Sequence, residues 1–109
     1  MKSEIKQLWI EALKTGKYKQ GIGYLKYRDN FCCLGVLVDC YLKQTAQSWE
    51  RGLCGIHFFE KETGTLPSTE EFRSWAGEIA ISQETKLTQL NDYDHANFEE
   101  IATWIEENL

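Results

Sequence analysis

Apolar residues recur at intervals of three and four along much of the chain, which is the spacing of one face of an α-helix. Over residues 4–15 this apolar stripe consists of Ile5, Leu8, Trp9, Ala12 and Leu13. Ser3 is a candidate N-cap, and Gly16 suits the position just beyond the end of a helix. The pattern therefore predicts an amphipathic first helix that buries one face.

Residues 31–42, with the sequence FCCLGVLVDCYL, are the most apolar stretch of the chain. Their composition fits a strand or a helix, but their length favours a helix, which Asp29 or Asn30 can cap. Such a helix is apolar on nearly every side and is expected at the buried centre of the domain. Gly35 costs about 1 kcal/mol relative to alanine in a helix, and close approach of another element would explain its presence.

The C-terminal half predicts shorter helices. Ser68–Glu71 and Asn97–Glu100 have the spacing of a capping box, in which a Ser or Asn is followed three residues later by Glu. A further helix is expected from about Gln83, and the last one is expected to end near Glu107. The residues expected to face the core are Phe72, Trp75, Ala76, Leu87, Leu90, Phe98, Ile101, Trp104 and Ile105.

The segments with a sequence typical of β-strands are short. Residues 24–27 read as a strand that ends at the turn 28–30, residues 56–59 are strand-like, and 65–66 fit a returning strand. The prediction is a compact single α+β domain over residues 1–109. It has a central buried helix, about three further helices and a small antiparallel sheet.

Composition and charge narrow the class of protein. A chain of 109 residues has the length of a single domain. Its 13% aromatic content and single proline exclude a disordered or low-complexity chain. No apolar run approaches the roughly 20 residues that span a membrane, and the N-terminus lacks a signal-peptide core, so a soluble cytoplasmic protein is expected. The net charge of −5 is unfavourable for binding duplex nucleic acid.

The four cysteines are expected to be reduced. Cys33 and Cys40 lie seven residues apart, which in one helix separates their backbones by about 10 Å, too far for a disulfide. With Cys32 and Cys54 they are interpreted as small buried hydrophobic residues.

A family resemblance rests on several motifs in a fixed order. They are FCCLGVLVD at 31–39, WIEAL at 9–13, GKYKQG at 16–21, Leu66-Pro67, WAG at 75–77, LND at 90–92 and NF at 97–98. Over nearly the whole chain these resemble a family of small proteins encoded by bacteriophages and prophages. The resemblance implies a phage-type accessory protein in the cytoplasm of a bacterial host. Many such proteins counter host defences, but the resemblance implies no particular chemistry.

A segment rich in cations, glycines and tyrosines is the candidate binding site. The residues selected are Lys17, Tyr18, Lys19, Gly21, Gly23, Tyr24, Lys26 and Arg28. Rings interleaved with cations suit a ligand with a flat base and phosphates, and the amides of 16–23 are candidates for an anion nest. The segment is not a Walker A loop, because it lacks the terminal Gly-Lys-Ser/Thr. The alternative interpretation is a solvated turn with edge-strand residues, or a protein interface.

Catalytic and metal-binding patterns are incomplete. Asp92, Asp94 and His95 lie in a predicted polar loop between two helices, 91–95, that lacks the glycine and glutamate of a calcium loop. Cys54 and His57 lack the second close pair of a structural zinc site. We therefore expect no catalytic residues, no metal and no cofactor.

The leading functional hypothesis is a non-catalytic binder that captures a phosphorylated small molecule, such as a nucleotide signal, for a phage. One alternative is an inhibitor or adaptor that binds a host protein. Others are a small metal-dependent hydrolase or nuclease that uses residues 92–95, and a structural protein that forms a homo-oligomer.

Overall fold

A buried helix lies at the centre of the fold. The computed structural model describes residues 1–49, 66–67 and 69–109, and in it α2 spans Cys33–Gln44. The first eight residues of α2, Cys33–Cys40, are all buried. This confirms the prediction of a buried central helix, although the helix begins two residues later than the sequence pattern indicates.

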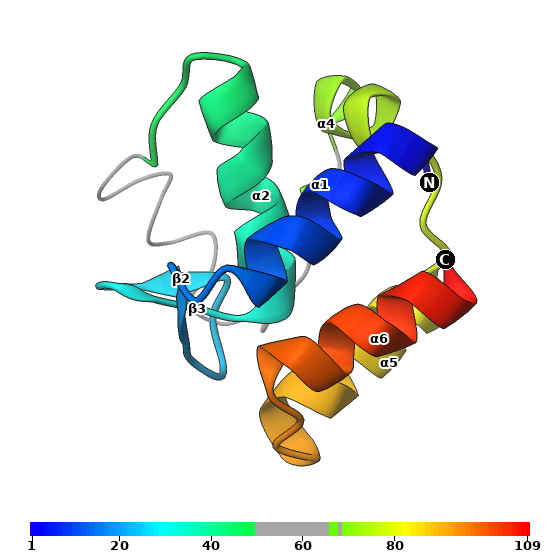
Figure 1. Cartoon of the computed structure of the whole chain (residues 1–109). Coiled ribbons are helices and arrows are strands. Elements are labelled where there is room, and N and C mark those ends of the chain that lie inside the picture. The colour runs from blue at the N-terminus through cyan, green and yellow to red at the C-terminus, as the bar shows by residue number, and fades with distance from the viewer. Residues whose placement is uncertain (50–65, 68) are drawn as a thin grey trace.

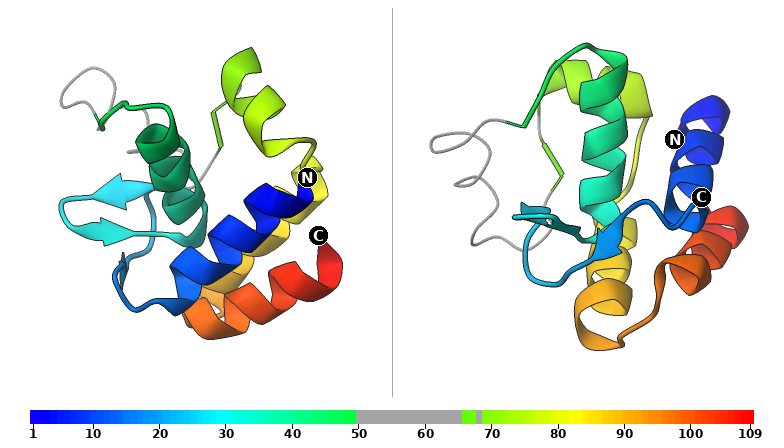
Figure 2. Two further views of the ribbon diagram at one scale, coloured as in Figure 1. Left: turned by 45° about the horizontal axis from the view of Figure 1, so that its top comes forward. Right: turned by 60° about the vertical axis from the view of Figure 1, so that its left-hand side comes forward.

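Four further α-helices and one π-helical turn are found in the described part of the chain (Figure 1). They are α1 (Ser3–Lys14), α4 (Glu70–Ala76), α5 (Ile81–Thr88), η1 (Gln89–Tyr93) and α6 (Phe98–Asn108). Helix α1 packs against both α2 and α6, and α5 packs against α2 (Figure 2). Together with a small sheet they form a compact single α+β unit, as predicted.

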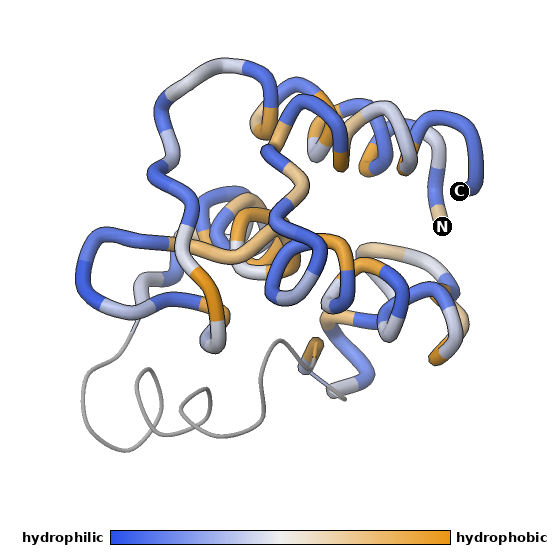
Figure 3. The backbone as a smooth tube through the Cα atoms, turned by 90° about the horizontal axis from the view of Figure 1, so that it is seen from below, coloured by the Kyte–Doolittle hydropathy of each residue, from blue (hydrophilic) through white to orange (hydrophobic). Residues whose placement is uncertain are grey.

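Hydrophobic positions of the helices turn toward one another, while hydrophilic positions lie outside (Figure 3). Trp9, Phe72 and Ile101 are among the fully buried side chains. Within the described ranges, no helix combines the length and the hydrophobicity needed to cross a bilayer.

The helix starts show which capping predictions were correct. In α6, Asn97 Oδ1 accepts a hydrogen bond from the Glu100 amide (2.8 Å) and Glu100 Oε1 accepts one from the Asn97 amide (2.9 Å), which confirms the capping box. The prediction of Ser3 as an N-cap was wrong, because Lys2 occupies that position and Ser3 already lies in α1. Helix α4 is capped by Thr69 Oγ1, and the predicted cap at Ser68 lies outside the described residues.

Helix α2 is capped by a thiol. Cys32 Sγ accepts a hydrogen bond from the Gly35 amide at 3.4 Å. The predicted caps, Asp29 and Asn30, were wrong, because Asn30 belongs to a strand and lies too early in the chain.

Within the described residues the sheet has three strands in the order β1-β3-β2, and they are β1 (Lys19–Gln20), β2 (Lys26–Tyr27) and β3 (Asn30–Phe31). The hairpin of β2 and β3 is antiparallel, but β1 pairs with β3 in parallel. The sheet is therefore mixed, whereas the sequence predicted an antiparallel one. The strand predicted at 56–59 lies outside the described residues, as does residue 65 of the strand predicted at 65–66, and Leu66 is not in a strand.

Gly35 allows the chain that leads into β2 to approach α2. A Cβ atom at this position would lie 1.8 Å from the Leu25 carbonyl oxygen. The same oxygen accepts a hydrogen bond from the Cys32 amide at 3.2 Å. The expected close approach at Gly35 is thus confirmed.

Asn91 joins three parts of the fold. Its side-chain oxygen accepts hydrogen bonds from Gln20 Nε2 (2.9 Å) and the Cys33 amide (3.2 Å), and its Nδ2 donates to the Gly21 carbonyl (2.9 Å). Asn91 is 1% exposed. The sequence interpretation of 91–95 as a polar loop was therefore wrong at this residue, which lies in η1 and holds the start of α2 next to β1.

Candidate ligand-binding pocket

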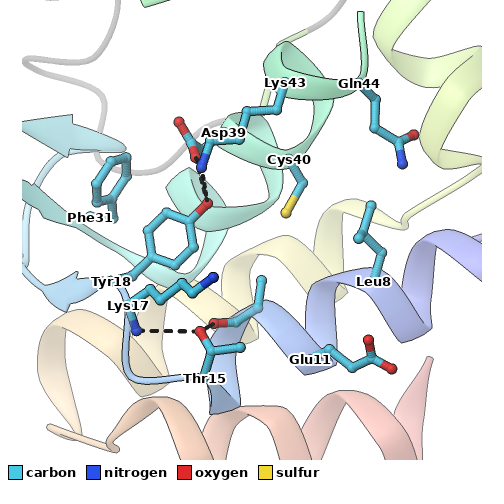
Figure 4. A pocket seen from close by; sticks show the side chains of 11 residues that line it. Leu8, Glu11, Thr15, Lys17, Tyr18, Phe31, Asp39, Cys40, Lys43 and Gln44 are labelled. Carbon is cyan, nitrogen blue, oxygen red and sulfur yellow. Dashed lines mark hydrogen bonds and ion pairs between the residues drawn. The ribbon is translucent and has the colours of Figure 1, made fainter.

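A pocket of about 520 Å³ lies between α1 and α2, beside the sheet (Figure 4). Its lining consists of Leu8, Glu11, Ala12, Thr15, Lys17, Tyr18, Phe31, Asp39, Cys40, Lys43 and Gln44. Positions 8, 11 and 12 of α1, with Thr15 just beyond its end, face positions 39, 40, 43 and 44 of α2, both at the spacing of one helix face. The crossing of two helices therefore creates the pocket, and the chain after α1 closes one end.

Asp39 is a buried carboxylate that fixes this end of the pocket. It is 7% exposed and accepts hydrogen bonds from the Tyr18 hydroxyl and from Trp49 Nε1 (2.8 Å). Lys43 Nζ lies 3.1 Å from its Oδ2. A buried charge is tolerated when it is paired and hydrogen-bonded in this way. Asp39 thus holds Tyr18 against α2.

Tyr18 is the aromatic wall of the pocket. Its ring packs edge-on against Phe31, with the ring centroids 5.0 Å apart. Burial, reinforced by the hydrogen bond to Asp39, raises the pKa of the Tyr18 hydroxyl well above its usual value. The hydroxyl therefore stays protonated and remains a donor to Asp39.

Two lysine side chains, Lys17 and Lys43, line the pocket. Lys43 Nζ is 5.4 Å from the centroid of the Tyr18 ring and 3.4 Å from its hydroxyl. The Lys17 side chain also lines the pocket, and Figure 4 draws it on the same side of the pocket as Tyr18. Lys17 Nζ forms no hydrogen bond or ion pair with any residue that the structure describes, so it is available to an anion.

Between the two helices the pocket surface is largely apolar. It is formed by Leu8 and Ala12 of α1 and by Cys40 of α2. Burial, with a smaller contribution from the neighbouring Asp39 charge, raises the pKa of the Cys40 thiol to about 11. The thiol is therefore protonated at neutral pH and behaves as an apolar group rather than as a nucleophile.

Only two of the eight residues selected for the predicted binding site line the pocket. They are Lys17 and Tyr18. The other selected residues lie elsewhere, and they are Lys19 on β1, Gly21 and Gly23 in the following turn, and Tyr24, Lys26 and Arg28 at the β2–β3 hairpin. Lys26 Nζ donates to the Arg28 carbonyl (2.6 Å), and the Arg28 guanidinium stacks on the Tyr27 ring at 5.3 Å.

The anion nest predicted over 16–23 is wrong for two of its amides. The Gly21 amide donates to the Phe31 carbonyl at 2.8 Å, and the Lys17 amide donates to Thr15 Oγ1 at 3.3 Å. A Cβ at Gly21 would lie 2.7 Å from Asn30 Cβ. This glycine therefore serves strand packing rather than an anion.

Sequence reasoning missed Asp39, Lys43 and the α1 face of the pocket. The one available signal was a lone carboxylate inside the most apolar stretch of the chain, with a lysine four residues later. Such a carboxylate is expected to have partners, because an unpaired buried charge is costly.

Of the two candidate metal sites, the structure describes the one at residues 92–95. Asp92 Oδ1 accepts a hydrogen bond from Asn91 Nδ2 (2.8 Å), and Asp94 and His95 are exposed. The described residues contain no group of three or more potential metal-binding side chains. Cys54 and His57 lie outside them.

Residues 1–80 match the family model of a domain of unknown function, DUF8296. The chain belongs to the DUF8296 family. None of the curated proteins and no solved structure matches it. The matched part of this DUF8296 protein contains every residue that lines the pocket, whereas α5, η1 and α6 follow it.

Proposed function

We propose that this DUF8296 protein binds a phosphorylated small molecule with a flat ring, of the nucleotide type, in the pocket between α1 and α2. The observation that carries the proposal is the presence of an apolar surface, two lysine side chains and an aromatic ring in one pocket. The volume of about 520 Å³ falls in the range of small-molecule sites.

The phosphate is assigned to the end of the pocket at Tyr18. Lys17 can donate all three of its ammonium hydrogens. Lys43 already contacts Asp39 and the Tyr18 hydroxyl, and it can donate its remaining hydrogen to the ligand. The contacts of Lys43 hold its ammonium group in place before a ligand arrives, which lowers the entropy lost on binding. The ring of the ligand then lies over Leu8 and Ala12.

Binding without conversion is the simplest activity for this pocket. The nearest thiol, Cys40, is protonated at neutral pH, and the Asp39 carboxylate is already engaged by three donors. In the proposed biological setting the protein is a phage-type accessory protein in the cytoplasm of a bacterial host. There it sequesters a nucleotide signal and so counters a host defence. The FCCLGVL resemblance supports this setting.

The test compares Lys17→Ala with Lys19→Ala. Both remove one exposed lysine from the same segment, but only Lys17 lines the pocket. Loss of a charged hydrogen bond of about 1.5–3 kcal/mol should weaken binding roughly tenfold or more in Lys17→Ala, and Lys19→Ala should bind as the wild type does. Binding should also weaken as salt rises, since Lys17 is exposed.

The probes are mononucleotides, cyclic nucleotides and ADP-ribose-type nucleotides. The protein is incubated with each nucleotide, filtered and denatured, and the released compound is identified by mass spectrometry. Intact release indicates sequestration, and an altered compound indicates an enzyme. If no nucleotide is retained at micromolar protein, or if both substitutions weaken binding equally, the assignment of the pocket is wrong.

A second candidate function, binding of a host protein, is favoured by the exposed residues near the hairpin. Ile22 is 55% exposed and Tyr27 is 46% exposed, and the Tyr27 ring packs against Tyr24 at 5.2 Å. Tyrosine and arginine are enriched at protein interfaces, and Arg28 adjoins this group. Ile22→Ser with Tyr27→Ser should abolish capture of a host protein and leave nucleotide binding intact, whereas Lys17→Ala should do the reverse.

A further inference from the structure

Charged side chains of both signs line the pocket between α1 and α2 (Figure 4). The acidic ones are Glu11 and Asp39, and the basic ones are Lys17 and Lys43. The Tyr18 hydroxyl and the Cys40 thiol also line the pocket, and both are neutral at pH 7 because burial raises the pKa of each. The lining formed by the described residues therefore has no net charge.

The charge of Lys43 is already balanced inside the protein. Its Nζ lies 3.1 Å from Oδ2 of Asp39, which is a buried residue. Removal of this partner would leave the Asp39 carboxylate with less compensation in a site of low polarity, which is unfavourable. Lys43 can still donate a hydrogen bond to a ligand, but the pair as a whole is neutral. Of the two lysines, only Lys17 lacks an ion pair with any residue that the structure describes.

The charge of a ligand affects its binding free energy in two opposing ways. Attraction to the Lys17 ammonium grows in proportion to the negative charge, whereas the free energy of removing the ligand from water rises with the square of that charge. Glu11 opposes every added negative charge from its place in the lining, because a Coulomb interaction depends on distance and requires no hydrogen-bond geometry. One negative charge on the ligand is therefore balanced by Lys17, and a second is not.

We infer that the pocket selects a ligand with a single negative charge, a phosphodiester rather than a terminal phosphate. This inference rests on the proposed function and narrows it to nucleotides whose phosphate is esterified twice, as in a cyclic mononucleotide. A phosphodiester carries one charge at neutral pH. A phosphate monoester has a second pKa near 6 and carries about −1.5 to −2 at pH 7. Nucleoside diphosphates and triphosphates carry more charge and are disfavoured for the same reason.

The experiment measures the binding of matched monoesters and diesters by calorimetry at neutral pH. The ligands are adenosine 5′-monophosphate and its methyl phosphodiester, together with the corresponding pair of cytidine compounds. The members of each pair share the base and the sugar, and they differ by one charge and one methyl group. The wild type should bind the diester about fivefold more tightly, because the second charge of the monoester is desolvated without a second unpaired cation.

Glu11→Gln separates the effect of charge from that of the methyl group. Glu11 is exposed and has no hydrogen bond or ion pair with the described residues, so the fold should be retained. Loss of its charge favours the monoester more than the diester, and the preference should fall to about twofold or less. Glu107→Gln removes an exposed carboxylate from α6, outside the pocket lining, and should keep the wild-type preference.

The outcomes separate this inference from the proposed function. Equal binding within a pair, or tighter binding of the monoester, that is lost in Lys17→Ala would overturn the single charge and leave the proposed function standing. A preference for the diester that Glu11→Gln leaves unchanged would assign the preference to the methyl group and would also overturn the inference. Binding of none of the four compounds, by a protein that retains its circular dichroism spectrum, would overturn both.

Discussion

Replacement of Gly35 by alanine tests the closest approach in the fold. Helix propensity alone predicts that Gly35→Ala stabilises α2 by about 1 kcal/mol. The structure predicts the opposite sign, because the new methyl group would lie 1.8 Å from the Leu25 carbonyl oxygen and 2.6 Å from its carbon. These are backbone atoms of a fully buried residue, and they cannot move aside as a flexible side chain does.

The expected loss of stability in Gly35→Ala follows from the displacement of the Leu25 backbone. Ordinary contact would require Leu25 to retreat by roughly 1.5 Å, and overpacking of this kind costs about 3 kcal/mol or more. The shift also breaks the hydrogen bond from the Cys32 amide to the Leu25 carbonyl, which contributes about 1 kcal/mol. After subtraction of the gain in propensity, the net destabilisation is about 3 kcal/mol, a large share of the 5–15 kcal/mol that is typical of a domain.

Urea denaturation followed by circular dichroism measures this difference. The matched control is Gly23→Ala, where φ is +90° and no atom lies within 4 Å of the new Cβ. Gly23→Ala should cost only the strain of the left-handed conformation, about 1–2 kcal/mol. A Gly35→Ala protein as stable as the wild type would refute the close approach of Leu25 to α2.

Three further predictions concern stability. Asn91→Ala should cost about 3–5 kcal/mol by urea denaturation, because it leaves a buried amide and a carbonyl without partners, whereas a loss below 1 kcal/mol would show that Asn91 does not join η1 to α2. Asp39→Ala should cost about 3 kcal/mol and Lys43→Ala less than about 1 kcal/mol, since the lysine is largely exposed, and equal losses would contradict this division. Burial raises the pKa of the Cys40 thiol from 9.0 to about 11, so its contribution to stability is complete below pH 9 and is lost as the pH rises through 11. The free energy of unfolding should therefore fall over this pH range, by up to about 3 kcal/mol from this thiol. Cys40→Ala should make the fall shallower without removing it, because burial also raises the pKa of the Cys32 and Cys33 thiols.

The sequence by itself determined the features that depend on neighbours along the chain. The stripe that includes Ile5, Trp9 and Leu13 predicts α1, because residues three and four apart share one face of a helix. The capping box of α6 follows in the same way from Asn97 and Glu100. The run of apolar residues from 31 to 42 predicts that α2 is buried, because a helix without a polar face has no side to turn to solvent.

Only the tertiary structure decided where distant segments meet. The parallel pairing of β1 with β3 and the strand at Asn30–Phe31 depend on the hydrogen bonds of Asn91, some 60 residues later in the chain. For the pocket, the sequence identified Lys17 and Tyr18 from local composition. It could not add Asp39, because a helical pattern shows which residues share a face but not which helix that face will meet. The crossing of α1 and α2, fixed by packing throughout the core, brings the two faces together.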